Sequence, residues 1–268
     1  MNFPKVTIIL PTWLEKNKRY LDLAIESIRN LNYPKEQIET ILIGRKSYKP
    51  EYDGVLSIAP YSDEFANPVG VNFGAKHASP DSKYLLLFND DAILTKNSIL
   101  KMVELSELNS APLVLNGISP CDSWLYAAIF QYKKDGQIKH VQKKFTRYED
   151  FVGDFKEMMD ADSVYAPMLW TQVPFLCLYA SMVPRNLWNE LGGFNENFET
   201  SADDLDFCHR AMQAGAQLAV ATNVLIWHFG GVTSSETMTY ELRKKSARVY
   251  RDYYGHWPPG VDDAFMEK

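Results

Sequence analysis

The chain has 268 residues, of which 46% are hydrophobic, 13% aromatic and 23% charged. This apolar fraction is normal for a globular protein and excludes a wholly disordered chain or a fibrous repeat. Twenty-eight basic residues against thirty-four acidic ones leave a net charge of −6, which disfavours a surface built to neutralise many phosphates. Nucleic acid is therefore a disfavoured partner, although a local basic patch could still bind it.

The three cysteines, Cys121, Cys177 and Cys208, are too few for a disulfide framework and show no metal-ligand spacing. We expect them to be reduced, buried thiols of a cytoplasmic protein. The uncharged segment 163–184 is as long as a membrane span, but its prolines and polar residues disfavour a continuous spanning helix. With no leader sequence visible, we expect no transmembrane segment and leave peripheral attachment to a membrane open.

Strand and helix patterns alternate in the first part of the chain. Apolar or β-branched runs predict strands, and apolar residues spaced three or four apart predict helices. The predicted strands cover 6–10, 38–43, 55–59 and 84–88. The predicted helices cover 21–31, 70–78 and 98–108. This alternation indicates a parallel sheet with helices on its faces.

The second part of the chain is less regular. A turn signal at 133–136 predicts a hairpin of 125–132 with 137–143, and 144–172 is irregular and rich in aromatic residues. Further strands are predicted at 175–183, near Leu218 and at 224–227. Further helices are predicted at 185–191, 203–214 and 237–254. Because no repeat or low-complexity linker interrupts the chain, we expect one compact domain over 1–268.

An acidic run, Asn89-Asp90-Asp91, directly follows the apolar strand 84–88. In open α/β sheets, ligands bind outside the carboxyl ends of the strands, so these acids stand where a site is expected. Two adjacent acids leaving a buried strand call for a positive partner, and a divalent cation would supply it. A solvated turn or a helix N-cap explains the same residues without a ligand.

A second acidic run covers 201–206. Ser201 could cap the following helix, and Asp203 and Asp204 would suit its positive end. Asp206 and Arg210 are four residues apart and are typical of an ion pair on a helix surface. A catalytic role for this run is the alternative.

His228 follows the predicted strand 224–227 and precedes Gly230-Gly231. A single histidine is usually satisfied by backbone or carboxylate, and metal ligation is the alternative. The terminal helix has a basic side (Lys244, Lys245, Arg248, Arg251) and an aromatic side (Tyr240, Ala247, Tyr250, Tyr254). A solvated basic face opposite a packed one explains this pattern, and contact with a phosphate is the alternative.

Familiar cofactor and nucleophile motifs are missing from the sequence. It has no G-x-G-x-x-G fingerprint, no phosphate-binding G-x-x-x-x-G-K-S/T loop and no G-x-S-x-G elbow. Dehydrogenase, P-loop nucleoside triphosphatase and α/β-hydrolase functions are therefore disfavoured.

Taken in chain order, six segments resemble the family 2 glycosyltransferases, which have the GT-A fold. They are the strand 6–10 with Pro11-Thr12-Trp13, then Asn72-Phe73-Gly74 with Ala78, Asn89-Asp90-Asp91 at the D-x-D position, 191–198, Asp203 to Arg210, and His228 to Gly231. The resemblance implies an α/β fold: a Rossmann-like mixed sheet with helices on both faces. Residues 1–115 would form the half that binds a nucleotide-sugar, and 116–268 the half that binds the acceptor and carries catalysis.

The resemblance also implies a metal-dependent, inverting transfer of sugar from a nucleotide-diphospho-sugar to an acceptor hydroxyl, by default on a surface glycan or oligosaccharide. Asp91 and His228 would bind the divalent metal, and Asp204 would be the general base. Donor-binding positions would be Pro11, Thr12, Trp13, Glu15, Gly44, Arg45, Asn72, Asn89 and Asp90. Acceptor-binding positions would be Trp170 and Asp203. Mixed carboxylate and imidazole ligation suits Mn²⁺ better than Mg²⁺.

The chain departs from the family pattern in several places. Gly44-Arg45-Lys46 stands where an acid usually helps to hold the nucleobase, so UDP, GDP and dTDP donors all stay open. Leu14 replaces a frequent Asn, and Asp203 replaces the usual Glu. Segment 117–172 has no matching motif and is where acceptor recognition would be built.

Two other functions remain open. The acceptor could be a modified nucleobase in DNA or a protein side chain. Alternatively, the chain could be a degenerate module that binds a nucleotide-sugar without catalysis, which the missing acid favours. The joint presence of Asp91, Asp204 and His228 argues for catalysis. Oligomeric state cannot be read from the sequence.

Overall fold

The computed structural model describes residues 3–12, 18–59, 67–120, 131–140, 147–151, 153–198, 202–230 and 240–267. Several residues singled out above lie outside these ranges: Trp13, Leu14, Glu15, Cys121, Ser201 and Gly231.

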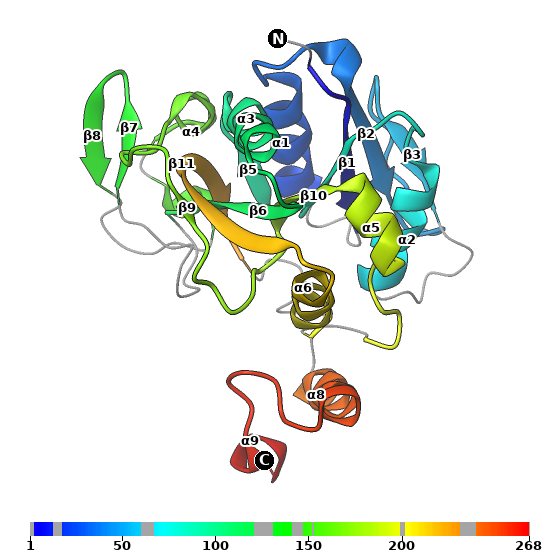
Figure 1. The fold of residues 1–268 in the computed structure, drawn as a ribbon. Coiled ribbons are helices and arrows are strands. Elements are labelled where there is room, and N and C mark those ends of the chain that lie inside the picture. Colours follow the sequence, from blue (N-terminus) through cyan, green and yellow to red (C-terminus); the bar gives the residue numbers. More distant parts are fainter. Residues whose placement is uncertain are drawn as a thin grey trace.

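A mixed β-sheet forms the centre of the molecule (Figure 1). In sheet order its strands are β3 (Leu56–Ile58), β2 (Ile38–Ile43), β1 (Val6–Pro11), β4 (Tyr84–Phe88), β10 (Ala180–Pro184), β6 (Leu113–Ile118), β11 (Gln217–His228) and β5 (Ala92–Leu94). The short β9 (Leu169–Trp170) also pairs with β11. Four strand pairs are parallel: β1 with β2, β1 with β4, β2 with β3, and β6 with β11. The other four are antiparallel: β10 runs antiparallel to β4 and β6, and β5 and β9 run antiparallel to β11.

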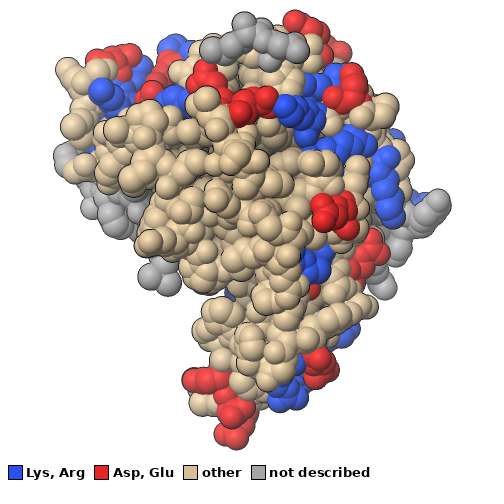
Figure 2. All heavy atoms as spheres, in the orientation of Figure 1, with Lys and Arg blue, Asp and Glu red and all other residues tan. Residues whose placement is uncertain are grey.

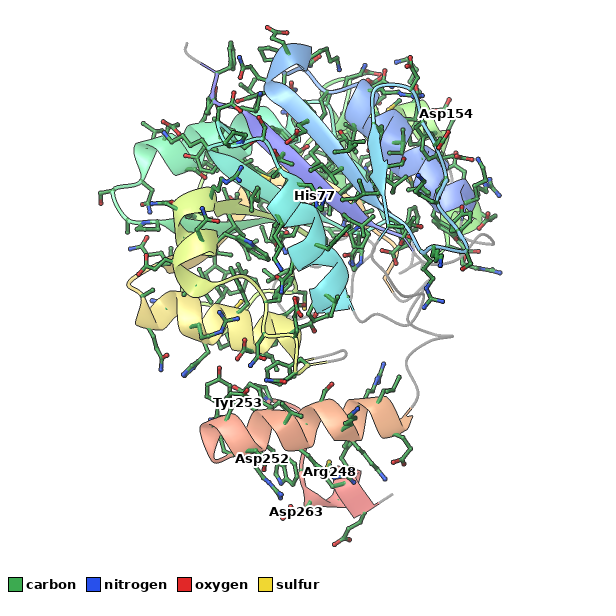
Figure 3. All side chains as sticks on the ribbon, turned by 90° about the vertical axis from the view of Figure 1, so that its right-hand side faces the viewer. His77, Asp154, Arg248, Asp252, Tyr253 and Asp263 are labelled. Atoms are coloured by element: carbon green, nitrogen blue, oxygen red, sulfur yellow. The ribbon has the colours of Figure 1, made fainter. Side chains whose placement is uncertain are left out.

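Helices cover both faces of the sheet, as predicted (Figures 1 and 3). On one face lie α1 (Lys18–Arg29) and α3 (Ser98–Leu108), and on the other α2 (Asn67–His77) and α5 (Arg185–Leu191). Next to α5 lies α6 (Asp203–Gln213). Because helices cover both faces, every residue of β1 and β4 is buried. This burial explains the uninterrupted apolar runs of these strands.

The predicted hairpin is present as β7 (Gln131–Lys134) and β8 (Gln137–His140). Its turn residues Asp135 and Gly136 have φ of 50° and 78°. Two successive positive φ values are typical of the type I′ turns that match the twist of paired strands. The outer parts of the two predicted strands lie outside the described residues.

Residues 144–172 are more regular than predicted. They include a 3₁₀ turn at Tyr148–Asp150, the helix α4 (Phe155–Asp160) and β9. The Asp154 carboxylate caps α4 by accepting the Glu157 N–H at 2.7 Å. With one and a half turns, α4 is too short for its periodicity to stand out, and the strand pairing of β9 is visible only in three dimensions.

Other strand predictions were wrong in detail. The strand predicted at 175–183 begins only at Ala180, because 176–179 leaves the sheet to contact other elements. The two strands predicted near Leu218 and at 224–227 are one strand, β11, with a register shift between Ala221 and Leu225. Neither β5 nor β6 was predicted.

The C-terminal helices α8 (Tyr240–Tyr254) and α9 (Asp263–Glu267) lie beyond α6, away from the sheet (Figures 1 and 3). Phe198, Ala202 and Tyr250 form a small core of their own between α8 and α6. Lys245, Arg248 and Arg251 are exposed, as predicted. Lys244 is not: it is buried on the packed side, 3.5 Å from the Glu241 carboxylate. The basic face is therefore narrower than the sequence indicated.

In the Asp206–Arg210 pair Asp206 is buried and Arg210 is half-buried, which corrects the assignment of the pair to the helix surface. Asp206 is 1% exposed and accepts hydrogen bonds from Arg210 Nε at 2.8 Å and from the Tyr254 hydroxyl at 2.7 Å. The Arg210 guanidinium also donates to the carbonyls of Leu191 and Gly193, at 2.9 and 3.0 Å. The pair therefore ties α6 to the loop after α5 and to α8.

Removing one member of this pair should be costly. We expect Asp206→Ala to lower the free energy of unfolding by about 3–5 kcal/mol, because the Arg210 charge would lose its partner. Urea unfolding followed by circular dichroism measures the loss. The matched control is Asp252→Ala on the exposed side of α8 (Figure 3), which should change stability by less than about 0.5 kcal/mol. Equal stabilities for the two variants would contradict the assignment.

No helix within the described ranges is long and apolar enough to cross a membrane. Neither Cys177 nor Cys208 forms a disulfide within the described residues; Cys208 is buried and Cys177 half-buried.

Candidate functional site

The predicted acidic and histidine residues meet at one edge of the sheet. Parallel strands end together, so Thr12 after β1, Asp91 after β4 and His228 at the end of β11 reach the same edge. Because β10 is antiparallel, its first residue Ala180 pairs with Phe88, the last residue of β4. The residue before β10, Tyr179, therefore also lies at this edge.

Asp91 and His228 are in direct contact. The Oδ1 atom of Asp91 lies 3.4 Å from Nε2 of His228, and the two residues are only 5% and 8% exposed. Hydrogen bonds of the backbone fix the position of both residues. Phe229 N–H donates to the Asp91 carbonyl, and His228 N–H donates to the Ser119 hydroxyl, each at 3.1 Å. The family resemblance implies that Asp91 and His228 act together, and the fold brings these two side chains into contact.

The chemistry of this pair fits a divalent cation that is shared with a substrate. Asp91 and His228 offer a carboxylate oxygen and an imidazole nitrogen close enough to contact one ion. Within the described ranges, no group of three or more His, Cys, Asp or Glu side chains is placed to hold a metal. Cations of the Mg²⁺ type are often held by one or two side chains plus substrate phosphates and water. The protein would therefore supply only part of the coordination.

Asp90 is held by Thr12. The Thr12 hydroxyl donates to Asp90 Oδ2 at 2.8 Å, and both side chains are buried. Thr12 N–H donates in turn to the Ile43 carbonyl at 2.8 Å, and Pro11 pairs with Ile43. These contacts join the ends of β1, β2 and β4, the strands whose ends form the predicted donor side.

Asp204 lies within electrostatic reach of His228. Its Oδ2 atom accepts the Leu178 N–H at 3.1 Å. Burial and then the negative charge of Asp203 raise its pKa well above the ordinary value, while the Leu178 bond and His228 act in the opposite direction. The sequence suggested that the helix start would hold Asp204 ionised, but burial outweighs it. A raised pKa suits a residue that must accept a proton.

Helix capping does not explain Asp204. The N-cap of α6 is Ala202, and the described hydrogen bond of Asp204 runs to Leu178, outside the helix. Asp203 is buried and accepts the Asn67 amide N–H at 3.3 Å. Burial raises the pKa of Asp203, against the hydrogen bonds that it receives from Asn67 and from the first backbone N–H groups of α6. Asp203 therefore faces the helix start and α2.

Tyr179 is a site residue that the sequence did not indicate. Its ring stacks on the His228 imidazole with centroids 4.1 Å apart and an angle of 7° between planes. Its hydroxyl donates to the Gly117 carbonyl at 3.1 Å. Its carbonyl accepts the N–H of Asn89, a half-buried residue, at 2.8 Å. An aromatic residue directly before a strand is a weak sequence signal, so only the fold reveals it.

Asn72 is engaged with the glycine loop after α5. Its amide donates to the Phe194 carbonyl and to Glu196 Oε1 and accepts the Phe194 N–H, each at 2.9 Å. A Cβ on Gly193 would lie 2.4 Å from Asn72 Oδ1, and Gly193 has φ of +77°. Only glycine fits there. Both ends of the Asn72 amide are thus used, and its donor-binding role stays a prediction.

Gly44 and Arg45 follow β2 at the same edge. The Gly44 N–H donates to the Ile58 carbonyl at 2.9 Å, and a Cβ on Gly44 would lie 2.5 Å from the Tyr48 carbonyl oxygen. Arg45 N–H donates to that carbonyl at 2.7 Å. Arg45 Nε is buried and has no hydrogen-bond partner among the residues that the structure describes.

Trp170 is not brought to the Asp91–His228 pair. It pairs with Val220 in β11, eight positions before His228, or about 26 Å along an extended strand. Its side chain is 40% exposed. Figure 2 shows a broad uncharged area on this face of the molecule, over β9 and β11. An acceptor-binding role of Trp170, which stays a prediction, would need an extended acceptor.

No protein-family model and no curated protein sequence matches the chain. Solved structures do match. A mannosyltransferase of Pyrobaculum calidifontis, PcManGT, in complex with GDP-Man and Mn²⁺ is 14% identical, with a TM-score of 0.59 over 99% of this chain and 69% of that one. Residues 1–349 of S. aureus TarS in complex with UDP-GlcNAc are 12% identical, with a TM-score of 0.59 over 98% and 69%. The same TarS segment, in a further structure, has a TM-score of 0.57 over 98% and 68%, at 12% identity.

These matches cover nearly the whole chain and confirm the predicted fold class: an α/β, GT-A-like glycosyltransferase fold. At such low identity they show the fold alone. What the chain does must be argued from its own residues.

Proposed function

We propose that this chain is a metal-dependent glycosyltransferase that moves a sugar from a nucleotide-diphospho-sugar to an acceptor hydroxyl. The observation that carries the proposal is the juxtaposition of the buried Asp91–His228 pair with Asp204 at the carboxyl edge of the sheet. PcManGT, with the same fold, binds GDP-Man and Mn²⁺, and TarS binds UDP-GlcNAc. These ligands support a nucleotide-sugar as the donor.

Each site residue has a definite task in this proposal. Asp91 and His228 would hold a divalent cation, Mn²⁺ in preference to Mg²⁺. When bound, the cation supplies positive charge to the leaving diphosphate. Asp90, oriented by Thr12, would face the donor. Asp204 would accept the proton of the acceptor hydroxyl as the sugar bond forms, and inversion of the anomeric centre follows if this is one direct displacement.

The acceptor that we favour is a hydroxyl of a surface glycan or an oligosaccharide. The acidic net charge of the chain disfavours DNA, whereas a protein acceptor stays an alternative. Neither described cysteine is in a disulfide with another described residue, which supports the cytoplasm as the location.

Thermal unfolding with a panel of UDP-, GDP-, dTDP- and CMP-sugars, with and without Mn²⁺, tests the proposal. A donor at 100 times its dissociation constant should stabilise the folded state by about 2.7 kcal/mol. Release of the nucleoside diphosphate from that donor then separates an enzyme from a module that only binds. If no sugar nucleotide raises the melting temperature with Mn²⁺ present, the proposed function is wrong.

Arg45 is the residue that we expect to contact the donor nucleotide from β2. Its buried Nε lacks a partner among the described residues, and a nucleobase carbonyl or a phosphate oxygen would supply one. Arg45→Ala should weaken donor binding by about tenfold, the worth of one hydrogen bond to a charged group. The neighbouring Lys46 is exposed, so Lys46→Ala is the matched control. Isothermal titration compares them, and equal donor affinities would sink the assignment.

A further inference from the structure

We propose that Tyr179 is a positioning residue: its ring sets the plane of the His228 imidazole beside Asp91. The turn that carries Tyr179 also holds Asp204 in place. This inference rests on the proposed function for its catalytic meaning, but not for its geometry. The contacts of residues 176–179, here called the bridge segment, carry it.

The bridge segment is attached firmly to β6. The Asn116 amide donates to the Cys177 carbonyl at 2.8 Å, and that carbonyl also accepts the Tyr179 N–H at 2.9 Å. The Tyr179 hydroxyl donates to the next β6 residue, Gly117. Asn116 is fully buried and Tyr179 is 2% exposed. The ring of Tyr179 is thus fixed at its backbone and at its hydroxyl.

The same segment contacts α6 and the end of β4. Leu176 N–H donates to Cys208 Sγ at 3.3 Å, and Leu178 N–H donates to the Asp204 carboxylate at 3.1 Å. Asn89 N–H donates to the Tyr179 carbonyl. Four residues therefore connect the strand end that carries Asp91, the helix start that carries Asp204 and the ring of His228.

A histidine ring can turn about its χ2 bond unless something holds it. The Tyr179 ring lies flat against one face of the His228 imidazole and restricts that rotation. Removing the hydrogen-bonding partners that orient a metal-binding histidine typically weakens metal binding by about 10–100-fold, and we expect a stacked ring with the same orienting role to act on this scale.

Two substitutions separate stacking from the hydroxyl bond. Tyr179→Phe keeps the ring, whereas Tyr179→Leu removes it, with Tyr179→Met as a second ring-free variant should the leucine protein not fold. The control is Tyr84→Leu, which removes a buried tyrosine from the opposite end of β4. The first readout is the set of His228 imidazole proton shifts in the metal-free protein, assigned with His228→Gln. The second is Mn²⁺ affinity, measured with the metal alone by electron paramagnetic resonance.

We expect the wild type, Tyr179→Phe and Tyr84→Leu to share an upfield ring-current displacement of the His228 signals, and Tyr179→Leu or Tyr179→Met to lose it. Mn²⁺ binding should weaken by about 10–100-fold in the ring-free variants only. Unchanged His228 signals in a folded ring-free variant would overturn the inference. A wild type that binds no Mn²⁺ would count against the metal site, while the His228 signals would still decide the role of Tyr179.

Discussion

Replacing Asp204 with asparagine is expected to lower the rate of sugar transfer by about 10²–10⁴-fold, the usual contribution of a general base. Asparagine keeps the shape of the side chain and can still accept the Leu178 N–H. It cannot take the proton of the acceptor hydroxyl. Donor and metal binding should persist, because neither depends on Asp204. The measurement is the transfer rate at saturating donor, once the donor panel has identified one.

The stability of Asp204→Asn should also depend on pH differently from that of the wild type. The pKa of Asp204 is raised in the folded protein, whereas an unfolded aspartate titrates near about pH 4. Between these two values the folded state keeps a proton that the unfolded state has lost, so stability falls as the pH rises through this range. The asparagine side chain would not titrate. The melting temperature of Asp204→Asn relative to wild type should therefore increase from pH 4 to pH 7.

A role of Asp204 as a helix cap alone would give a different result for both the transfer rate and the stability. Loss of a helix cap lowers stability by about 0.5–2 kcal/mol and leaves turnover largely intact. The exposed Asp252 provides the control variant, Asp252→Asn, which should change neither the rate nor the pH dependence. A fully active Asp204→Asn protein with unaltered stability would rule out both interpretations of Asp204.

Asp91→Ala is expected to abolish the dependence of donor binding on Mn²⁺. The carboxylate and His228 are the two described groups that lie together at the proposed metal position, and removing one leaves a single imidazole. Donor affinity with and without Mn²⁺, measured by isothermal titration, should become equal. The control is Asp252→Ala, which removes an acid of the same size from an exposed surface.

His228→Ala should have the same effect, and the double variant should be no worse than either single one. Residues that act as a unit are strongly non-additive, because losing the first partner already removes the function. Additive losses for Asp91→Ala and His228→Ala would mean that they do not share one cation. Donor binding in Asp91→Ala that still responds to Mn²⁺ would place the metal elsewhere.

The strands at the centre of the sheet could be predicted because their neighbours in space impose a simple pattern. A strand covered on both faces is apolar throughout, so 84–88 was found with its observed bounds. The apolar second half of 38–43 marked that strand as well. The Asn89-Asp90-Asp91 run stood out because it directly follows such a strand, at the sheet edge where ligands bind, although a turn or a helix cap explained it as well. Local composition is enough where burial is complete.

Short elements escaped prediction because pairing, and not composition, creates them. β5 and β9 have three and two residues and exist as strands only through their pairing with β11. The Asp206–Arg210 pair has the spacing of a surface pair. It leaves the surface, with Asp206 buried and Arg210 half-buried, because the end of α5 and helix α8 pack against it. Helical spacing gives the face of a residue but not what covers that face.

The sequence by itself determined the α/β class, the acids at the strand end and the histidine that shares their edge. The class and the acids follow from the short range over which burial and helix or strand periodicity act, whereas the histidine was assigned through the resemblance to the family 2 glycosyltransferases. Only the tertiary structure decided that Asp91 contacts His228, that Asp204 is buried enough to raise its pKa, and that Tyr179 covers the imidazole. These contacts join residues far apart in the chain. The distances between these residues depend on the order of the strands in the sheet and on the path of the bridge segment before β10. No local sequence pattern encodes either of them.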